Sequence, residues 1–214
     1  LASGELFAEQ GLAGVSIRDI VRKAGATLSA VNYHFGSKVG LYQETVRYAL
    51  EHHINAEDTV ALVRKVTIAT PQEAADFLYE FVLRLFRNYL APEHPRWLER
   101  LINRAVVDAS EDVSATIAEV LRPADEAIRD MLLRCVPGLH STEADLWRMC
   151  LTGQIHYFLM ARSVINQLLN RDEDAYSPEF IEQSARYVAR NMVSNLGLPL
   201  PAPVREGELK PPSP

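Results

Sequence analysis

The sequence predicts an all-α protein of about nine helices. Apolar residues recur at spacings of three and four over most of the chain, and few stretches alternate as a strand does. Capping sequences and glycines separate these periodic segments. With 214 residues, of which 48% are hydrophobic, the chain can bury a sizeable core. No apolar run approaches the roughly 20 residues of a membrane-spanning helix, so we expect no membrane partner.

The first fifty residues predict four helices separated by short turns. Ser16 and Asp19 have the spacing of a capping box, and Thr27 is a suitable N-cap for the helix that follows. Glycine commonly ends a helix because it adopts left-handed backbone angles without strain. The expected helices are one that ends at Gly11, one from Ser16 to Gly25, one from Thr27 to about Phe35, and one from Ser37 through Leu50.

Longer helices are expected beyond residue 70. Thr70 and Glu73 form a second capping box, with Pro71 in the first helical position. Pro123 falls inside a periodic segment and predicts a kink. The expected helices run from Thr70 through Tyr89, around 97–105, around 113–132, from Ser141 to Leu169, and from Ser177 to Gly197.

The charge is unevenly distributed along the chain. The net charge is −6, which argues against a protein that simply coats nucleic acid. Residues 1–50 nevertheless hold five basic and four acidic groups, so any contact with a polyanion is expected there. Cys135 and Cys150 lie in apolar patterns and are expected to be buried thiols, which favours a reducing compartment, the cytoplasm.

The helix at 27–35 is expected to pack on one side and to be exposed on the other. At about 100° per residue, Val31 and Phe35 share one side. The opposite arc can contact base edges, since asparagine pairs with adenine, serine with a base or phosphate, and leucine with a thymine methyl. Two short helices joined at Gly25 form a helix-turn-helix candidate, although the same periodicity fits a solvated face of a small bundle. The arc consists of Leu28, Ser29, Asn32 and Tyr33.

Four segments in this region together resemble a known family. They are LFAEQG at 6–11, SIRDI at 16–20, AGAT at 24–27 and NYHFGSK at 32–38. Their sequence and spacing are similar to the DNA-binding region of TetR-family transcriptional regulators. Beyond residue 70, the segments around Leu121-Arg122-Pro123 and Gly153-Gln154 resemble the CecR-type C-terminal subgroup.

The resemblance implies a set of DNA-contacting residues. Ser16 and Arg18 would contact phosphates, as would Lys38 in the first turn of its helix. His34 either contacts phosphate or has a core or hinge role. The family's basic N-terminal arm would lie upstream of Leu1. The complete set is Ser16, Arg18, Thr27, Leu28, Ser29, Asn32, Tyr33, His34 and Lys38.

The chain departs from the family at two positions of this set. The family commonly has a basic residue where this chain has Leu28 and an aromatic one where it has Asn32, so the resemblance does not imply an operator sequence. It does imply a division into a helix-turn-helix domain at 1–50 and a ligand-binding and dimerisation domain at 51–198. Six of the twelve prolines fall after residue 198, which predicts an extended Pro-rich tail at 199–214.

The resemblance also implies a homodimer formed by the last two helices. The helix from Ser141 is apolar on two surfaces. The first surface includes Leu146, Trp147, Leu151, Tyr157 and Phe158, and the second includes Met149, Ile155, Leu159 and Met160. We expect one of the two surfaces to face the bundle interior and the other to face a partner. The residues of the last helix expected at the dimer interface are Ile181, Ser184, Ala185, Val188, Ala189 and Met192.

An effector pocket is expected where polar residues interrupt apolar stripes. A buried polar group needs a partner, which can be a ligand, a water molecule or another side chain. Asn88 and Gln154 are such residues, and Trp97 and Trp147 could line an apolar cavity. The alternative is that all four are ordinary core residues.

The predicted function is that of a ligand-responsive repressor, which binds a palindromic operator in double-stranded DNA as a homodimer and is released by a small molecule. The alternatives are an activator of the same fold, or a helix-turn-helix protein that acts through a protein partner. An enzyme is not expected, because the sequence has no phosphate-loop order, His-x-x-x-His pair or Gly-x-Ser-x-Gly elbow. Neither a cofactor nor a metal is expected.

Overall fold

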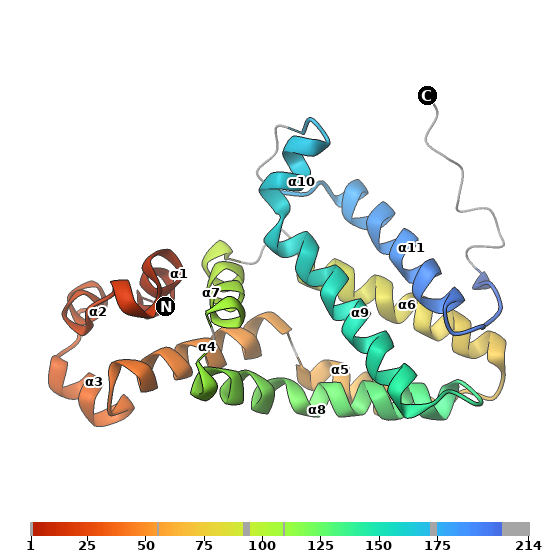
Figure 1. Ribbon diagram of the computed structural model, residues 1–214, viewed down its shortest axis with the longest axis horizontal. Coiled ribbons are helices and arrows are strands. Elements are labelled where there is room, and N and C mark those ends of the chain that lie inside the picture. Colours follow the sequence, from red (N-terminus) through yellow and green to blue (C-terminus); the bar gives the residue numbers. More distant parts are fainter. Residues whose placement is uncertain (1, 55, 92–94, 109, 172–174, 203–214) are drawn as a thin grey trace. The chain divides into compact units, whose positions relative to one another are not determined.

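The computed structural model describes residues 2–54, 56–91, 95–108, 110–171 and 175–202, and over these ranges it consists of helices and connecting segments without strands (Figure 1). The all-α prediction is confirmed, with eleven helices in these ranges where about nine were expected. They are α1 (Ala2–Gly14), α2 (Ile17–Ala24), α3 (Leu28–Phe35), α4 (Lys38–Ile54), α5 (Ala56–Lys65), α6 (Pro71–Leu90), α7 (Arg96–Val107), α8 (Glu111–Cys135), α9 (Ser141–Met160), α10 (Arg162–Leu168) and α11 (Pro178–Ser194).

The chain divides into two compact units that interleave along the sequence. The first comprises Leu1–Thr59 and Glu93–Ala124, and the second comprises Val60–Pro92 and Asp125–Pro214. Packing therefore places α7 and the first half of α8 with the N-terminal helices, whereas the expected boundary at residue 50 left them in the second domain. Most of the expected tail, 203–214, lies outside the described residues.

The core of the first unit joins α1, α4 and α7. Phe7 and Val46 are completely buried, and the Phe7 ring meets the Tyr42 ring edge-on with centroids 5.0 Å apart. Helix α7 lies against α1 where the Trp97 ring covers Gly4, and a Cβ at this glycine would collide with the indole. Leu101 of α7 completes the buried cluster.

The helix ends of the first unit follow the predicted caps. The Ser16 hydroxyl oxygen accepts a hydrogen bond from the Asp19 amide, and Gly25 ends α2 in the left-handed conformation. Helix α1 is interrupted at Gly11, whose φ of 72° and ψ of 175° are not helical, before it resumes to Gly14. The predicted stop at Gly11 therefore appears as a break within α1.

The core of the second unit is formed largely by α6 and α11, which run side by side in opposite directions (Figure 1). Arg87 near the end of α6 pairs with Glu182 near the start of α11. Hydrogen bonds from Arg87 and Arg186 lower the pKa of Glu182 to about 2. At the other end, the Gln72 side-chain amide donates to the Leu200 carbonyl oxygen beyond α11.

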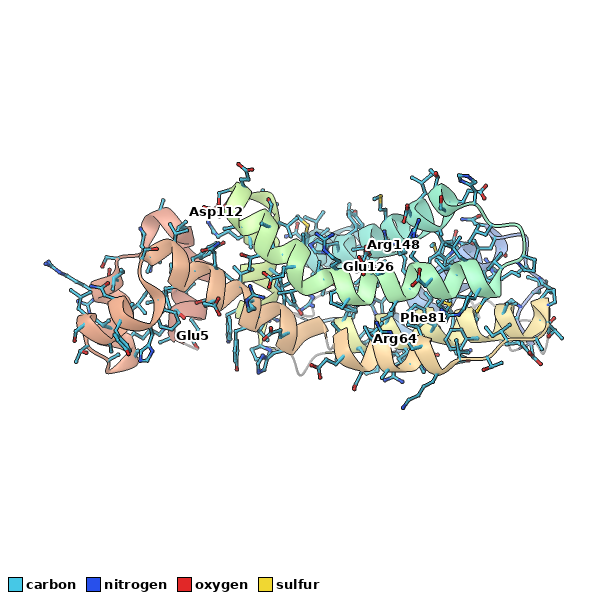
Figure 2. The ribbon with its side chains drawn as sticks, turned by 90° about the horizontal axis from the view of Figure 1, so that it is seen from below. Glu5, Arg64, Phe81, Asp112, Glu126 and Arg148 are labelled. Atoms are coloured by element: carbon cyan, nitrogen blue, oxygen red, sulfur yellow. The ribbon has the colours of Figure 1, made fainter. Side chains whose placement is uncertain are left out.

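Charged groups also hold α9 to the second half of α8. Arg148 of α9 lies beside α8 (Figure 2) and pairs with Asp125 and Asp145. Arg129 of α8 pairs with Asp145 at 3.1 Å. Burial lowers the pKa of Arg148.

The single long helix expected from Ser141 to Leu169 is two helices. Ala161 lies between α9 and α10 with a φ of −95° and a ψ of 14°. The N-cap of α9 is His140, and its ring nitrogen accepts from the Thr142 amide while the Glu143 carboxylate accepts from the His140 amide. Helix α5 was not expected from the sequence, and α11 ends three residues before Gly197.

None of the described helices is long and apolar enough to cross a membrane. Cys135 is buried as expected, and this burial raises the pKa of its thiol. The expectation for Cys150 is wrong, because its side chain is exposed on α9.

Candidate functional site

Helices α2 and α3 form the predicted helix-turn-helix. Gly25 ends α2, and the Thr27 hydroxyl oxygen accepts a hydrogen bond from the Ala30 amide at the start of α3. Val31 on α3 and Ile20 on α2 are both buried, so the two helices share one small core. Gly36 ends α3 with a φ of 70°. The third helix is thus fixed at both ends and along one side.

The opposite face of α3 is open to solvent. Tyr33 is 85% exposed and Leu28 is 44% exposed, and the side chains of Ser29 and Asn32 are exposed as well. This confirms the predicted exposure of the arc. The packing expected of Phe35 is corrected, since this ring is 36% exposed and Val31 alone is buried on α3.

Two of the residues expected to contact phosphate, Ser16 and Arg18, lie at the start of α2. Arg18 is exposed, while the Ser16 hydroxyl both accepts from the Asp19 amide and donates to its carboxylate. The hydrogen bond from Ser16 lowers the pKa of Asp19. Ser16 and Thr27 therefore cap the two helices in addition to any DNA contact.

Lys38 and His34 lie on either side of Gly36. The Lys38 ammonium donates a hydrogen bond to the Val15 carbonyl oxygen at 3.1 Å, which ties the start of α4 to the segment before α2. The His34 side chain is exposed, and its ring lies edge-on to that of Tyr33. Exposure rules out the core alternative for His34 and leaves the phosphate and hinge alternatives.

The α11 residues expected at the dimer interface are mostly core residues of a single chain. Ile181, Ala185, Val188, Ala189 and Met192 are buried within the protomer in the core that α11 shares with α6. A side chain enclosed by its own chain cannot face a second copy, so this expectation is corrected for Ile181, Ala185, Ala189 and Met192, whereas Val188 also lines the groove between α10 and α11. Ser184 is half-buried and stays available to a partner.

The exposed apolar surface of the second unit lies on α9, α10 and the other side of α11. The division of α9 expected from its periodicity is wrong, because Leu146 and Tyr157 are exposed and Leu159 is buried. A groove of about 470 Å³ runs between α10 and α11 beside Tyr157. The large exposed apolar residues of these three helices are Leu146, Met149, Tyr157, Met160, Val164, Leu168, Leu169 and Tyr187.

The four residues expected in an effector pocket are divided between the units. Trp97 packs on Gly4 in the first unit, and Asn88 is exposed on α6 in the second. Trp147 and Gln154 do meet at one residue. The Trp147 indole donates to the Met192 carbonyl oxygen at 2.8 Å, and the Gln154 amide donates to the Met192 sulfur at 3.2 Å.

The sequence matches two family models. The one described as bacterial regulatory proteins of the tetR family matches residues 2–45, which include α2 and α3. The one described as the C-terminal domain of the HTH-type transcriptional dual regulator CecR matches residues 74–197, more than half of the chain. A search of curated proteins gave no significant match.

Solved structures of transcriptional regulators share the fold. Bacillus subtilis FadR in complex with stearoyl-CoA is 14% identical with a TM-score of 0.62, and the alignment covers 91% of this chain and 94% of that one. A regulator from Rhodococcus sp. Rha1 is 19% identical with a TM-score of 0.59, covering 91% and 93%. PfmR from Thermus thermophilus, a TetR-family regulator, is 18% identical with a TM-score of 0.57, covering 90% and 91%. Together with the two sequence matches, the helix-turn-helix and the all-helical second unit establish that this chain belongs to the TetR family of transcriptional regulators and has a CecR-type C-terminal domain.

Proposed function

We propose that the protein is a ligand-responsive transcriptional repressor, which binds a palindromic operator as a homodimer in the cytoplasm. The observation that carries this proposal is the open face of α3. It presents hydrogen-bonding side chains, including Asn32 and Tyr33, on a short helix fixed by Thr27 and Val31. A rigid helix of this kind fits the major groove of DNA.

Base reading and phosphate contact are assigned to different residues. Asn32 can pair with an adenine edge, and Leu28 can meet a thymine methyl group. Arg18 and Lys38 would contact phosphates, together with the helix N-termini that Ser16 and Thr27 cap. His34 is exposed and is assigned to the same phosphate group.

The homodimer would use the exposed apolar residues of α9, α10 and α11. Exposed apolar surface of this extent usually marks an interaction site. A twofold axis would present two α3 helices to successive half-sites of a palindrome. Of the α11 residues expected at the interface, this arrangement retains Ser184 and Val188, and it adds Tyr187.

The effector would bind in the second unit near Trp147 and Gln154. Both side chains reach Met192, so they connect α9 to α11. A thioether sulfur is a weak acceptor, and a ligand oxygen would be a better partner for the Gln154 amide. An effector releases DNA only if it prefers the conformation in which the two α3 helices do not match successive grooves.

The proposal is tested by operator selection and DNA binding with Asn32→Ala. DNase footprinting of DNA selected by the protein should show a protected inverted repeat. Asn32→Ala should weaken operator binding by about 1–3 kcal/mol and leave binding to random DNA nearly unchanged, because one bidentate base contact is lost. Gln10→Ala, which removes an exposed amide of α1, is the matched control. Equal losses on both DNAs would remove Asn32 from base reading, and the absence of any footprint would favour action through a protein partner.

Activation is the second candidate function. The matched C-terminal domain is described from a dual regulator, so a regulator with this domain can act in both directions. A reporter gene behind the selected operator distinguishes the two, since a repressor lowers its expression and an activator raises it.

Stearoyl-CoA, bound in the FadR structure, is the first effector to test for release of DNA.

A further inference from the structure

We propose that Gly153 of α9 lies on the twofold axis of the homodimer, where two α9 helices cross in antiparallel orientation. The inference rests on the homodimer of the proposed function and names the residues that meet in it. It follows from the position and spacing of the exposed residues of one helix.

One side of α9 is exposed although it is mostly apolar. Leu146, Met149, Tyr157 and Met160 are between 49% and 63% exposed, and Gly153 lies among them. At about 100° per residue, these five positions fall within an arc of about 80° centred near the glycine. We call them the α9 stripe. The other side of the helix, with Trp147, Leu151, Ile155 and Leu159, is buried in the core of the second unit.

The α9 stripe is symmetric in sequence about Gly153. Leu146 and Met160 lie seven residues before and after the glycine, and Met149 and Tyr157 lie four residues before and after it. A twofold axis through Gly153, perpendicular to the helix, therefore brings Leu146 opposite the partner's Met160. It also brings Met149 opposite the partner's Tyr157. Every apolar side chain of the stripe then faces an apolar side chain, as a self-complementary interface requires.

Gly153 allows the two helices to approach closely at the centre of the stripe. A Cβ built on this residue meets no other atom within 4 Å, so the space above it is open. Small residues at a crossing point let helix axes come closer than the usual 8–10 Å. Gly153 has ordinary helical neighbours, so the backbone conformation alone gives no reason for a glycine here.

The exposed surface is large enough for a stable dimer. The stripe continues through Tyr157 into the groove between α10 and α11, which also contains Leu168, Leu169 and Tyr187. Eight exposed apolar side chains at roughly 100 Å² each supply about 800 Å² per copy, which is the size of a standard interface. These observations favour a second copy of the chain over an unrelated partner, because the stripe matches its own twofold image.

Disulfide cross-linking of the full chain tests the axis. Only a residue on a twofold axis meets its own copy, so Gly153→Cys in a Cys150→Ser background should form a covalent dimer under copper–phenanthroline oxidation. Thr152→Cys in the same background is the matched control, since it is exposed and adjacent but points about 100° away. We expect most of the Gly153→Cys protein, and little of the control, to migrate as a dimer on a non-reducing gel.

A second pair of positions tests the antiparallel orientation and does not alter the glycine. In the Cys150→Ser background, the double variant Leu146→Cys/Met160→Cys should cross-link between copies, and Leu146→Cys alone should not. Cross-linking by Leu146→Cys alone would show parallel helices and overturn the proposal. A parent that sediments as a dimer but cross-links at neither Gly153 nor the 146/160 pair would overturn the axis and leave the homodimer standing. A monomeric parent would contradict the homodimer itself.

Discussion

The open face of α3 and the α9 stripe are both exposed, but their side chains differ in chemistry. Besides Leu28, the face of α3 carries a hydroxyl, an amide and a phenol, which are groups able to form specific hydrogen bonds with a polar groove. The stripe carries leucine, methionine and tyrosine around a glycine, which gain free energy when they are removed from water. Exposure alone therefore does not indicate whether a surface binds DNA or another protein chain. The hydrogen-bonding capacity of the exposed side chains does indicate it.

A second contrast separates α9 from α11. Both helices have apolar residues on more than one side. In α11 the small residues Ala185 and Ala189 are buried against the protomer core, and Tyr187 is exposed. In α9 the small residue Gly153 is exposed, and Trp147 is buried. In both helices the small residues permit another helix to approach closely. Which side of each helix is covered by a helix of the same chain is decided by the packing of the protomer.

The largest expected effect comes from placing a charge on either side of α11. Ala185→Glu would bury an unpaired carboxylate and should lower the free energy of unfolding by about 4 kcal/mol or more. Tyr187→Glu places the same charge on the exposed side. It should change the unfolding free energy of the protomer by less than about 0.5 kcal/mol and dissociate the dimer. Urea denaturation and sedimentation measure the two effects. If Ala185→Glu unfolded like the parent and only dissociated, the placement of the two sides of α11 would be reversed.

An intermediate effect is expected from Gln154→Leu, which tests whether the link to Met192 also serves an effector. The substitution keeps the approximate volume and removes one hydrogen-bonding group, so about 1.4 kcal/mol of effector affinity should be lost. The half-maximal concentration of stearoyl-CoA, or of another ligand shown to release operator DNA, should then rise about tenfold. Operator affinity without ligand, measured by fluorescence anisotropy, should be unchanged. Unchanged potency of the ligand would show that Gln154 only packs against Met192.

The smallest effect is expected from Lys38→Ala. The Lys38 ammonium already donates to the Val15 carbonyl oxygen, and its other two N–H groups can reach a phosphate. Binding to operator and random DNA should weaken equally, and the slope of log affinity against log salt should fall by about one. A lower unfolding free energy with an unchanged salt slope would instead assign Lys38 to the bond with Val15 alone.

Short-range features of the fold were predictable because their chemistry is local. The Ser16, Thr27 and Thr70 caps and the end of α2 at Gly25 depend on residues three or four positions apart. The exposed arc of α3 was predictable for the same reason, since an eight-residue helix with one buried position leaves little choice of face.

Features set by tertiary contact were not predictable from the sequence. Ala161 separates α9 from α10 without a proline or glycine to indicate it. A helix with apolar residues on both sides, such as α9 or α11, does not show in its sequence which side its own chain covers. The local charges of α5 do favour a helix, since Glu57 and Asp58 in its first turn and Arg64 and Lys65 in its last turn suit the helix dipole.

The interleaving of the two units affects the order in which the protein can fold during synthesis. Leu98, Leu101 and Ala105 of α7 and Val113 of α8 share a buried cluster with Phe7 and Val46. When the chain has left the ribosome only as far as residue 59, the helix-turn-helix is therefore outside but its core is unfinished. The DNA-binding unit can close only after residue 124 has left the ribosome. At that moment α6, made between the two parts of this unit, still lacks its neighbour α11, which begins more than fifty residues later in the chain.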